Sequence, residues 1–266
     1  LRRFVDRVGQ PGWCPGRAVA GGPETIRVNR EAASVAHHES FRRQLWDGEA
    51  AVLQGVIFDL DGTLADTLDL CVEAFQFAIK AHTGEQLSPA EVVALWGPTE
   101  EGVLRAAVGP EWEESVETFL SEYERLHVSV PEPFPGIRQL LDHLRAVGIP
   151  TAVVTGKGAR SAQISLEVLG IDDAFDAVEA GSIDGAIKAQ KISHIVERWG
   201  VPPASVIYIG DHPHDAVEAH KAGTMAVAAA WSDHTDVEAL RSSEPDEYFD
   251  SSFDFAAWLT SQTTPG

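Results

Sequence analysis

The sequence predicts an α/β fold: a doubly wound parallel sheet with a small helical domain inserted after the first strand. Apolar, β-branched runs alternate with stretches of helical periodicity, which is typical of a parallel sheet covered by helices on both faces. Between the first of these runs and Thr151, about ninety residues show helical periodicity and no convincing strand. With 266 residues, 44% of them hydrophobic, the chain is long enough to bury a full core.

Five apolar runs are the candidate strands. In chain order they are Val56–Phe58, Thr151–Thr155, Ala177–Glu179, Ser205–Ile209 and Met225–Ala230. The third run is short and the last consists largely of Ala, so these two carry weaker signals than the others.

Helices between the strands are predicted from apolar positions spaced three and four residues apart. One stripe runs from Ile137 to Val147 and ends at Gly148, and another runs from Ile192 to Trp199 and ends at Gly200. Short connections between strands and helices complete a doubly wound, Rossmann-like architecture.

The inserted segment contains three further apolar stripes of helical spacing. They include Leu70, Ala74, Phe77 and Ala78, then Val92, Val93 and Trp96, then Val116, Phe119, Leu120 and Tyr123. The Pro-rich stretch 131–136 is typical of a stiff linker back to the sheet. We therefore expect a helical domain over residues 69–133 and an α/β core formed by residues 55–68 and 134–266.

The first 54 residues differ from the rest of the chain. They carry eight Arg, no Lys and six acidic residues, and only Glu31–Trp46 has the pattern of a helix. The single methionine is Met225. We expect either a flexible arm or an over-extended reading frame with its true start near Val52. In both cases a chain that starts near Val52 is expected to fold and function, because the first strand needs only its neighbouring strands.

The composition excludes several classes of protein. Lys and Arg number 20 and Asp and Glu 41, so the net charge of −21 disfavours nucleic acid and anionic membranes as partners. The longest apolar run, Met225–Trp231, is far shorter than the roughly 20 residues that span a bilayer, and no segment resembles a signal peptide. Two cysteines, Cys14 and Cys71, make neither a disulfide framework nor a zinc cluster. We expect a cytoplasmic protein.

Carboxylates follow two of the candidate strands, at the edge where parallel sheets bind ligands. The four are Asp59, Asp61, Asp211 and Asp215. Their mutual repulsion calls for a cation, and oxygen-only ligands favour Mg²⁺, which binds carboxylates together with a substrate phosphate.

These residues resemble a known family. Asp59-Leu60-Asp61-Gly62-Thr63, Thr155, Lys188 and Gly210-Asp211 with Asp215 are similar, in order and spacing, to the four motifs of the haloacid dehalogenase-like hydrolases. The resemblance covers about residues 55–260. The helical insert resembles the type-one cap domain of phosphoglycolate-phosphatase-like members.

The resemblance implies a Mg²⁺-dependent phosphatase that hydrolyses a small phosphomonoester through an aspartyl-phosphate. Asp59 would be the nucleophile, and Asp61 would protonate the leaving oxygen and later activate water. The dehalogenase members lack the second Asp, so Asp61 favours phosphoryl transfer. Thr155, Gly156 and Lys188 would bind the phosphoryl group.

The resemblance also implies a set of metal ligands. Asp59, Asp211 and the main-chain carbonyl of Asp61 would hold Mg²⁺, and Asp215 would support the metal through water or by orienting its neighbours. No zinc site is expected at His212 and His214, which we interpret as exposed loop histidines.

The choice of lysine departs from the commonest pattern of the family, in which Pro follows the lysine. Lys188 lies four residues before Ile192 and therefore on the inward stripe of its helix, whereas Lys191 does not. We therefore expect Lys188, with Lys191 as the alternative.

Three nearby residues have simple structural interpretations. We expect Asp66 to cap the next helix, Lys157 to be a solvated loop lysine, and Cys71 to be a small buried hydrophobic residue.

Three other functions remain open. One is phosphonate hydrolysis, which would need a cap lysine for a Schiff base, and Lys80 is the lone candidate. A phosphomutase that resembles β-phosphoglucomutase would share the nucleophile and the cap, but it needs added cations for a second phosphate. The insert offers only Lys80, Arg105 and Arg125, which favours hydrolysis. A binding role with the Arg-rich arm on a partner is the third alternative. The expected ligand is a small phosphorylated metabolite, its identity is not readable, and the protein is expected to be a monomer or a homodimer.

Overall fold

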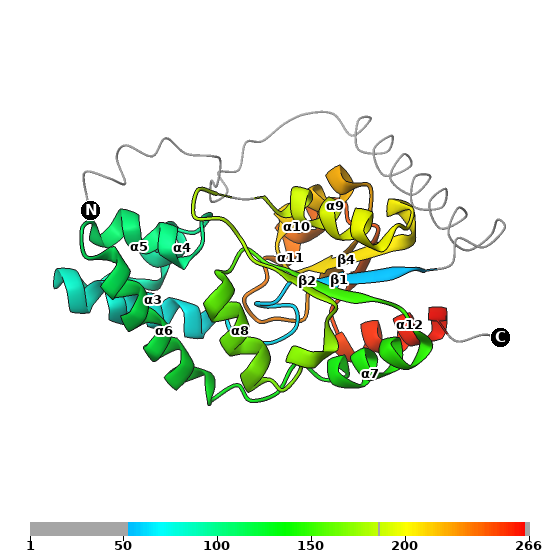
Figure 1. Ribbon diagram of the computed structural model, residues 1–266, viewed down its shortest axis with the longest axis horizontal. Coiled ribbons are helices and arrows are strands. Elements are labelled where there is room, and N and C mark those ends of the chain that lie inside the picture. Colours follow the sequence, from blue (N-terminus) through cyan, green and yellow to red (C-terminus); the bar gives the residue numbers. More distant parts are fainter. Residues whose placement is uncertain (1–52, 186, 264–266) are drawn as a thin grey trace, which may run out of the picture.

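The computed structural model describes residues 53–185 and 187–263 (Figure 1). Six strands form one sheet in the order β3-β2-β1-β4-β5-β6, and all neighbouring strands are parallel. The strands are β1 Gly55–Phe58, β2 Thr151–Val154, β3 Ala177–Glu179, β4 Val206–Gly210, β5 Met225–Ala229 and β6 Glu247–Phe249. The predicted doubly wound parallel sheet is therefore confirmed. The strand order reverses between β1 and β4, and a crevice at such a point is where α/β sheets bind ligands.

Helices cover both faces of the sheet (Figure 1). One face carries α7 (Ile137–Val147), α8 (Ala159–Val168) and α12 (Ser252–Thr263). The other carries α9 (Lys188–Trp199) and α10 (Pro213–Ala222).

Alternation along the strands builds these two layers. Phe58 packs with the first group of helices, whereas Ile57 packs with the second, and both side chains are fully buried. Every residue of β1, β2, β4 and β5 is buried, which explains why these strands appear in the sequence as continuous apolar runs.

The sixth strand is not among the five candidate strands of the sequence analysis. β6 lies at the edge, has three half-buried residues and follows the short helix α11 (Val237–Ser242). Two backbone hydrogen bonds extend its pairing with β5. The N–H of Asp246 donates to the carbonyl of Ala226 at 2.9 Å, and the N–H of Ala230 donates to the carbonyl of Phe249 at 2.8 Å. An edge strand this short has no periodic pattern to detect.

Four helices, which lie between β1 and α7 in the chain, form a group beside the sheet (Figure 1). They are α3 Leu68–Thr83, α4 Pro89–Val93, α5 Glu100–Val108 and α6 Trp112–His127. They share a hydrophobic cluster of their own, in which the rings of Phe75 and Phe119 lie 4.6 Å apart. This insert, α3–α6, covers the carboxyl-terminal side of β2 through contacts of α6 with α8.

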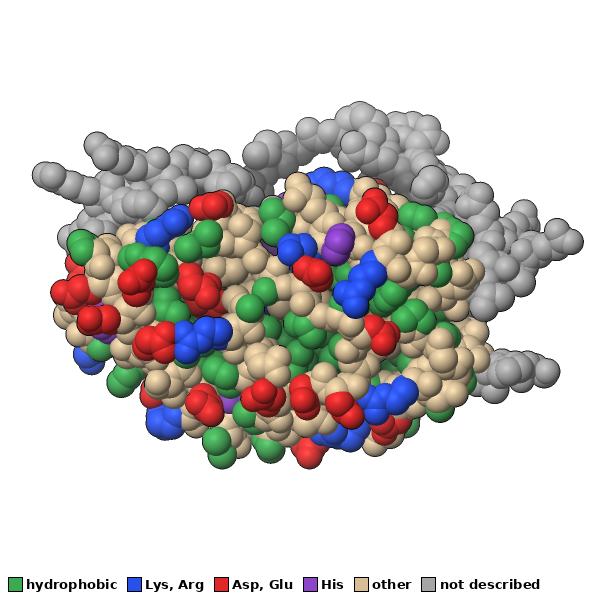
Figure 2. Space-filling view, in the orientation of Figure 1, with side chains coloured by type: hydrophobic (Ala, Val, Ile, Leu, Met, Phe, Trp, Pro, Cys, Tyr) green, Lys and Arg blue, Asp and Glu red, His purple; other side chains and the backbone are tan. Residues whose placement is uncertain are grey.

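The segment 1–54 lies almost entirely outside the described residues, and so does its candidate helix Glu31–Trp46. Leu53 is buried, and the backbone N–H of Gln54 donates to the carbonyl of Ser205 at 2.8 Å. Across residues 53–185 and 187–263, the helices are all too short or too polar to cross a membrane. On the face drawn in Figure 2, acidic side chains are dispersed over the insert and the lower edge, with basic side chains among them.

Candidate active site

Asp59 is the first residue after β1 and its side chain is buried. Its Oδ1 accepts the backbone N–H of Leu60 at 2.8 Å, and its Oδ2 accepts the Lys188 ammonium at 2.5 Å. Burial raises the pKa of Asp59 from 3.8 to about 6; Lys188 opposes this rise and Asp215 adds to it.

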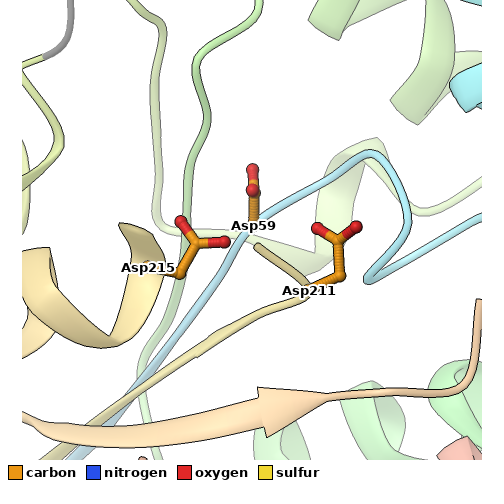
Figure 3. Close-up of side chains that lie close together, drawn as sticks. All are labelled: Asp59, Asp211 and Asp215. Carbon is orange, nitrogen blue, oxygen red and sulfur yellow. The ribbon is translucent and has the colours of Figure 1, made fainter. Parts of the chain in front are cut away.

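Two more carboxylates come from β4 and the start of α10. Asp211 directly follows β4, and Asp215 lies in the first turn of α10, where its Oδ2 accepts the backbone N–H of His212 at 3.0 Å. One oxygen from each of Asp59, Asp211 and Asp215 lies within 4.8 Å of the others. Figure 3 shows Asp59 between the other two, with the three side chains above the ends of the strands.

Two glycines make room for these carboxylates. Gly62 has a φ of +74°, and a Cβ there would overlap the Asp211 carboxylate. A Cβ on Gly210 would overlap the Asp215 carboxylate in the same way. Any side chain at either position would push a carboxylate out of the cluster.

The donor chemistry of the cluster fits a divalent cation. All three groups offer carboxylate oxygens, the ligands that hard cations prefer. Burial raises the pKa of Asp211 well above its usual range, and the Asp59 and Asp215 carboxylates raise it further. A bound cation would relieve this repulsion.

Lys188 is the basic residue of the cluster. Its Nζ lies 2.5 Å from Asp59 Oδ2 and 2.6 Å from Asp215 Oδ1. Burial alone lowers the pKa of Lys188, but the two carboxylates hold it well above its usual range. Lys191 instead pairs with Glu179 at 2.8 Å, so the structure brings Lys188 to the carboxylates and keeps Lys191 away.

Thr155 and Gly156 follow β2 at the same edge of the sheet. β2 pairs with β1 so that Val153 lies opposite Phe58. Asp59 and Thr155 come one and two residues after this pair, so both lie at the same end of the two strands. Thr155 is buried and its hydroxyl accepts the backbone N–H of Lys157 at 3.2 Å, whereas Gly156 is exposed.

The Asp61 side chain lies outside the cluster of three carboxylates. Its Oδ1 accepts the Thr67 hydroxyl at 2.6 Å and lies 3.4 Å from Lys157 Nζ. Of the four predicted carboxylates, the structure therefore brings three together and directs Asp61 toward the insert.

Two expectations about neighbouring residues are wrong. Lys157 is not solvated, because its side chain is only 2% exposed beneath the insert. Asp66 does not cap α3: the helix starts one residue later, with Thr67 as the preceding residue, and the Asp66 carboxylate faces the Ser232 hydroxyl at 3.4 Å. Cys71 is buried as expected, but it also contacts Lys157 Nζ at 3.0 Å.

Both histidines, His212 and His214, are exposed as expected, but His214 lies in the first turn of α10 and not in a loop. The His212 ring accepts the backbone N–H of His214 at 3.2 Å. His212 therefore caps α10.

Glu100 is a residue that sequence reasoning missed. It opens α5, yet its carboxylate accepts the Gly158 N–H and the Ser161 hydroxyl at the start of α8, both at 2.5 Å. Its partners are about sixty residues away in the chain, so no local signal indicates the contact.

Comparison with known proteins adds a family match. The family model described as haloacid dehalogenase-like hydrolase matches residues 56–229. Two similar curated proteins are named phosphatases. The putative pyrophosphatase PpaX of Caldanaerobacter subterraneus subsp. tengcongensis is 28% identical over 200 residues, 74% of this chain and 90% of that protein. The phosphoglycolate phosphatase of Chromobacterium violaceum is 28% identical over 191 residues, 67% of this chain and 86% of that protein.

A third relative has a different name. The tyrosine-protein kinase PtkA of Mycobacterium tuberculosis is 31% identical over 194 residues, 71% of this chain and 66% of that protein. Among solved structures, a predicted phosphoglycolate phosphatase from Haemophilus somnus has a TM-score of 0.66 at 23% identity. It covers 80% of this chain and 100% of its own, and it supports the fold.

Proposed function

The chain belongs to the haloacid dehalogenase-like hydrolases, and on that premise we propose a Mg²⁺-dependent phosphatase that hydrolyses a small phosphomonoester through an aspartyl-phosphate on Asp59. The observation that carries the proposal is the cluster at the strand ends. A buried carboxylate, Asp59, lies 2.5 Å from the Lys188 ammonium and within 4.8 Å of two further carboxylates. The Lys188 ammonium, together with a cation held by the carboxylates, would offset the repulsion between an anionic nucleophile and an anionic phosphoryl group.

The proposed reaction has two steps. The Asp59 carboxylate forms a bond to phosphorus as the ester bond breaks, and the leaving oxygen takes a proton from Asp61. Water then attacks phosphorus as the bond between phosphorus and the Asp59 oxygen breaks, and Asp61 takes a proton from that water. Inorganic phosphate leaves and Asp59 is again a carboxylate. Lys188 holds Asp59 in place and, with Thr155 and Gly156, would bind the phosphoryl oxygens.

The metal would be held by residues at this same edge. Asp59, Asp211 and the main-chain carbonyl of Asp61 would be its ligands, with Asp215 in support. When bound, Mg²⁺ neutralises negative charge on the carboxylates and the phosphoryl group. The all-carboxylate donor set and the raised pKa of Asp211 support such a site.

The basic residues of the insert favour hydrolysis over the phosphomutase alternative. In helices α3–α6 the lysines and arginines are Lys80, Arg105 and Arg125. Arg105 pairs with Asp184 at 3.2 Å and Arg125 pairs with Glu122 at 2.7 Å. Both are therefore engaged, and a second substrate phosphate would have to compete for them.

The substrate is proposed at the level of class, a small phosphorylated metabolite. The names of the relatives suggest phosphoglycolate and pyrophosphate as the first compounds to assay.

The test is release of inorganic phosphate from a panel of phosphomonoesters and pyrophosphate, with Mg²⁺ and with chelator, for the native chain and Asp59→Asn. We expect turnover that needs Mg²⁺ and that falls at least a thousandfold in the variant, because the covalent route is lost. Full activity in chelator, or a variant within tenfold of the native rate, would contradict the proposal.

A further inference from the structure

Lys157 is the one lysine or arginine that is buried in the described part of the chain. It lies in the loop between β2 and α8, and its ammonium extends under the insert. There it lies 3.0 Å from Cys71 Sγ on α3, 3.6 Å from Glu100 Oε1 on α5, and 4.2 Å from the ring centre of Tyr123 on α6. Side chains from three helices of the insert thus surround a cation that belongs to the loop after β2.

The same ammonium lies beside Asp61. Three contacts of the Asp61 carboxylate involve the same oxygen: Oδ1 faces Thr67 Oγ1 at 2.6 Å, Lys157 Nζ at 3.4 Å and Cys71 Sγ at 3.7 Å. Among the described residues the hydrogen bonds of this carboxylate are all on Oδ1, and the shortest distance to Lys157 Nζ is also from Oδ1. When contacts hold one oxygen of a carboxylate, the other oxygen remains available to exchange a proton with the substrate.

Glu100 contacts both the Lys157 ammonium and the start of α8, and it therefore joins this cation to the packing of the insert against α8. Its carboxylate binds the start of α8 through Gly158 and Ser161, and it also faces Lys157. A buried ammonium without partners is strongly unfavourable, so Lys157 is stable here only while Asp61 and Glu100 face it. Movement of α5 away from α8 would therefore remove a partner from Lys157 and change its contact with Asp61.

We propose that Lys157 is a positioning residue for Asp61. Its ammonium holds Oδ1, so that Oδ2 can face the leaving oxygen of the substrate. Because Glu100 also faces Lys157, this alignment depends on the contact between α5 of the insert and α8. The inference rests on the proposed function, in which Asp61 is the general acid and base. It adds a residue that acts through Asp61 and does not itself contact the substrate.

The test uses the dependence of the rate on the leaving group. An alkyl phosphomonoester needs protonation of its leaving oxygen, whereas p-nitrophenyl phosphate scarcely does. We expect Lys157→Met in the full chain to lower kcat for the alkyl ester about a hundredfold, and for p-nitrophenyl phosphate by less than tenfold. Lys80→Met, an exposed lysine of α3, is the matched control and should change neither rate.

Asp61→Asn separates this inference from the proposed function. That variant alone should show the same unequal losses. If it does not, the general acid role fails, and the proposed function fails with it. If it does, but Lys157→Met lowers both rates equally or lowers the alkyl rate less than tenfold, the positioning role is wrong. In the double variant of Asp61→Asn and Lys157→Met, the ratio of the two rate losses should equal that of Asp61→Asn alone, because Lys157 acts only through Asp61.

Glu100→Gln keeps the inference testable if Lys157→Met does not fold. It preserves the shape of the side chain and removes one charge that faces Lys157. We expect a cooperative unfolding transition and a loss for the alkyl ester several times larger than for p-nitrophenyl phosphate. Equal losses in a folded Glu100→Gln protein would overturn the inference.

Discussion

The charge on Asp59 shows how the fold sets the properties of a single side chain. Burial raises the pKa of Asp59 to about 6, although the Lys188 ammonium lies 2.5 Å away. In the metal-free protein this carboxylate therefore binds a proton more tightly when folded than when unfolded. A carboxylate with a raised pKa destabilises the fold once it ionises.

This leads to a pH prediction for the protein in chelator. Between about pH 4 and pH 6 the folded state holds the Asp59 proton and the unfolded state does not, so the free energy of unfolding should fall as the pH rises. Asp59→Asn should lack this part of the fall, which amounts to about 2–3 kcal/mol at roughly 1.4 kcal/mol per pKa unit. Urea denaturation at pH 4, 5, 6 and 7 measures it. Parallel stability curves for the two proteins would contradict the raised pKa.

At the scale of elements, the turn after β1 determines whether the carboxylates meet. Gly62 lies in this turn with a φ of +74°, directly against Asp211 at the end of β4. The turn and the strand are far apart in the sequence, and the β1–β4 pairing brings them together. The absence of a Cβ at Gly62 thus allows the turn to lie against the Asp211 carboxylate of the candidate metal site.

Gly62→Ala tests this link, with Gly84→Ala as its control. Gly84 has a nearly equal φ of +76° and open space around it, so Ala there should cost only the backbone strain of about 1 kcal/mol. Gly62→Ala adds the overlap with Asp211 and should lower stability further and reduce Mg²⁺-dependent turnover at least tenfold. Thermal unfolding and phosphate release measure both effects. Equal behaviour of the two variants would show that Asp211 is not confined by this turn.

At the scale of the whole molecule, a strongly acidic chain places two lysines in contact with carboxylates of the site. Lys188 joins the carboxylates at the strand ends, and Lys157 joins the sheet to the insert. The net charge of the chain is −21, and on the face drawn in Figure 2 acidic side chains are dispersed with basic ones among them. Binding of a divalent cation at the three carboxylates should therefore stabilise the entire fold, because the unfolded chain does not hold them together.

We predict that Mg²⁺ raises the melting temperature of the native chain. At a concentration of 100 times Kd the stabilisation is about 2.7 kcal/mol, which corresponds to several degrees for a domain of this size. Asp211→Asn should lose most of this shift, since it removes one of the three carboxylates. Scanning calorimetry in chelator and in Mg²⁺ gives the comparison. An equal shift in the variant would place the cation elsewhere.

The sequence by itself determined the parallel sheet and most of the residues at its carboxyl edge. Fully buried strands are continuous apolar runs, and residues such as Asp59 and Asp211 directly follow them, so local pattern and strand order predict their meeting. The position of Lys188 on the inward stripe of its helix separated it from Lys191 for the same reason.

Only the tertiary structure decided how the insert meets the sheet. It buried Lys157 under three helices, directed Asp61 toward that cation, and placed Glu100 on the first turn of α8. Edge strand β6 likewise exists through its pairing with β5. These contacts join residues that are far apart in the chain, and each depends on how two finished elements pack. Periodicity and spacing report which face a residue occupies, but they carry no information about which distant side chain that face will meet.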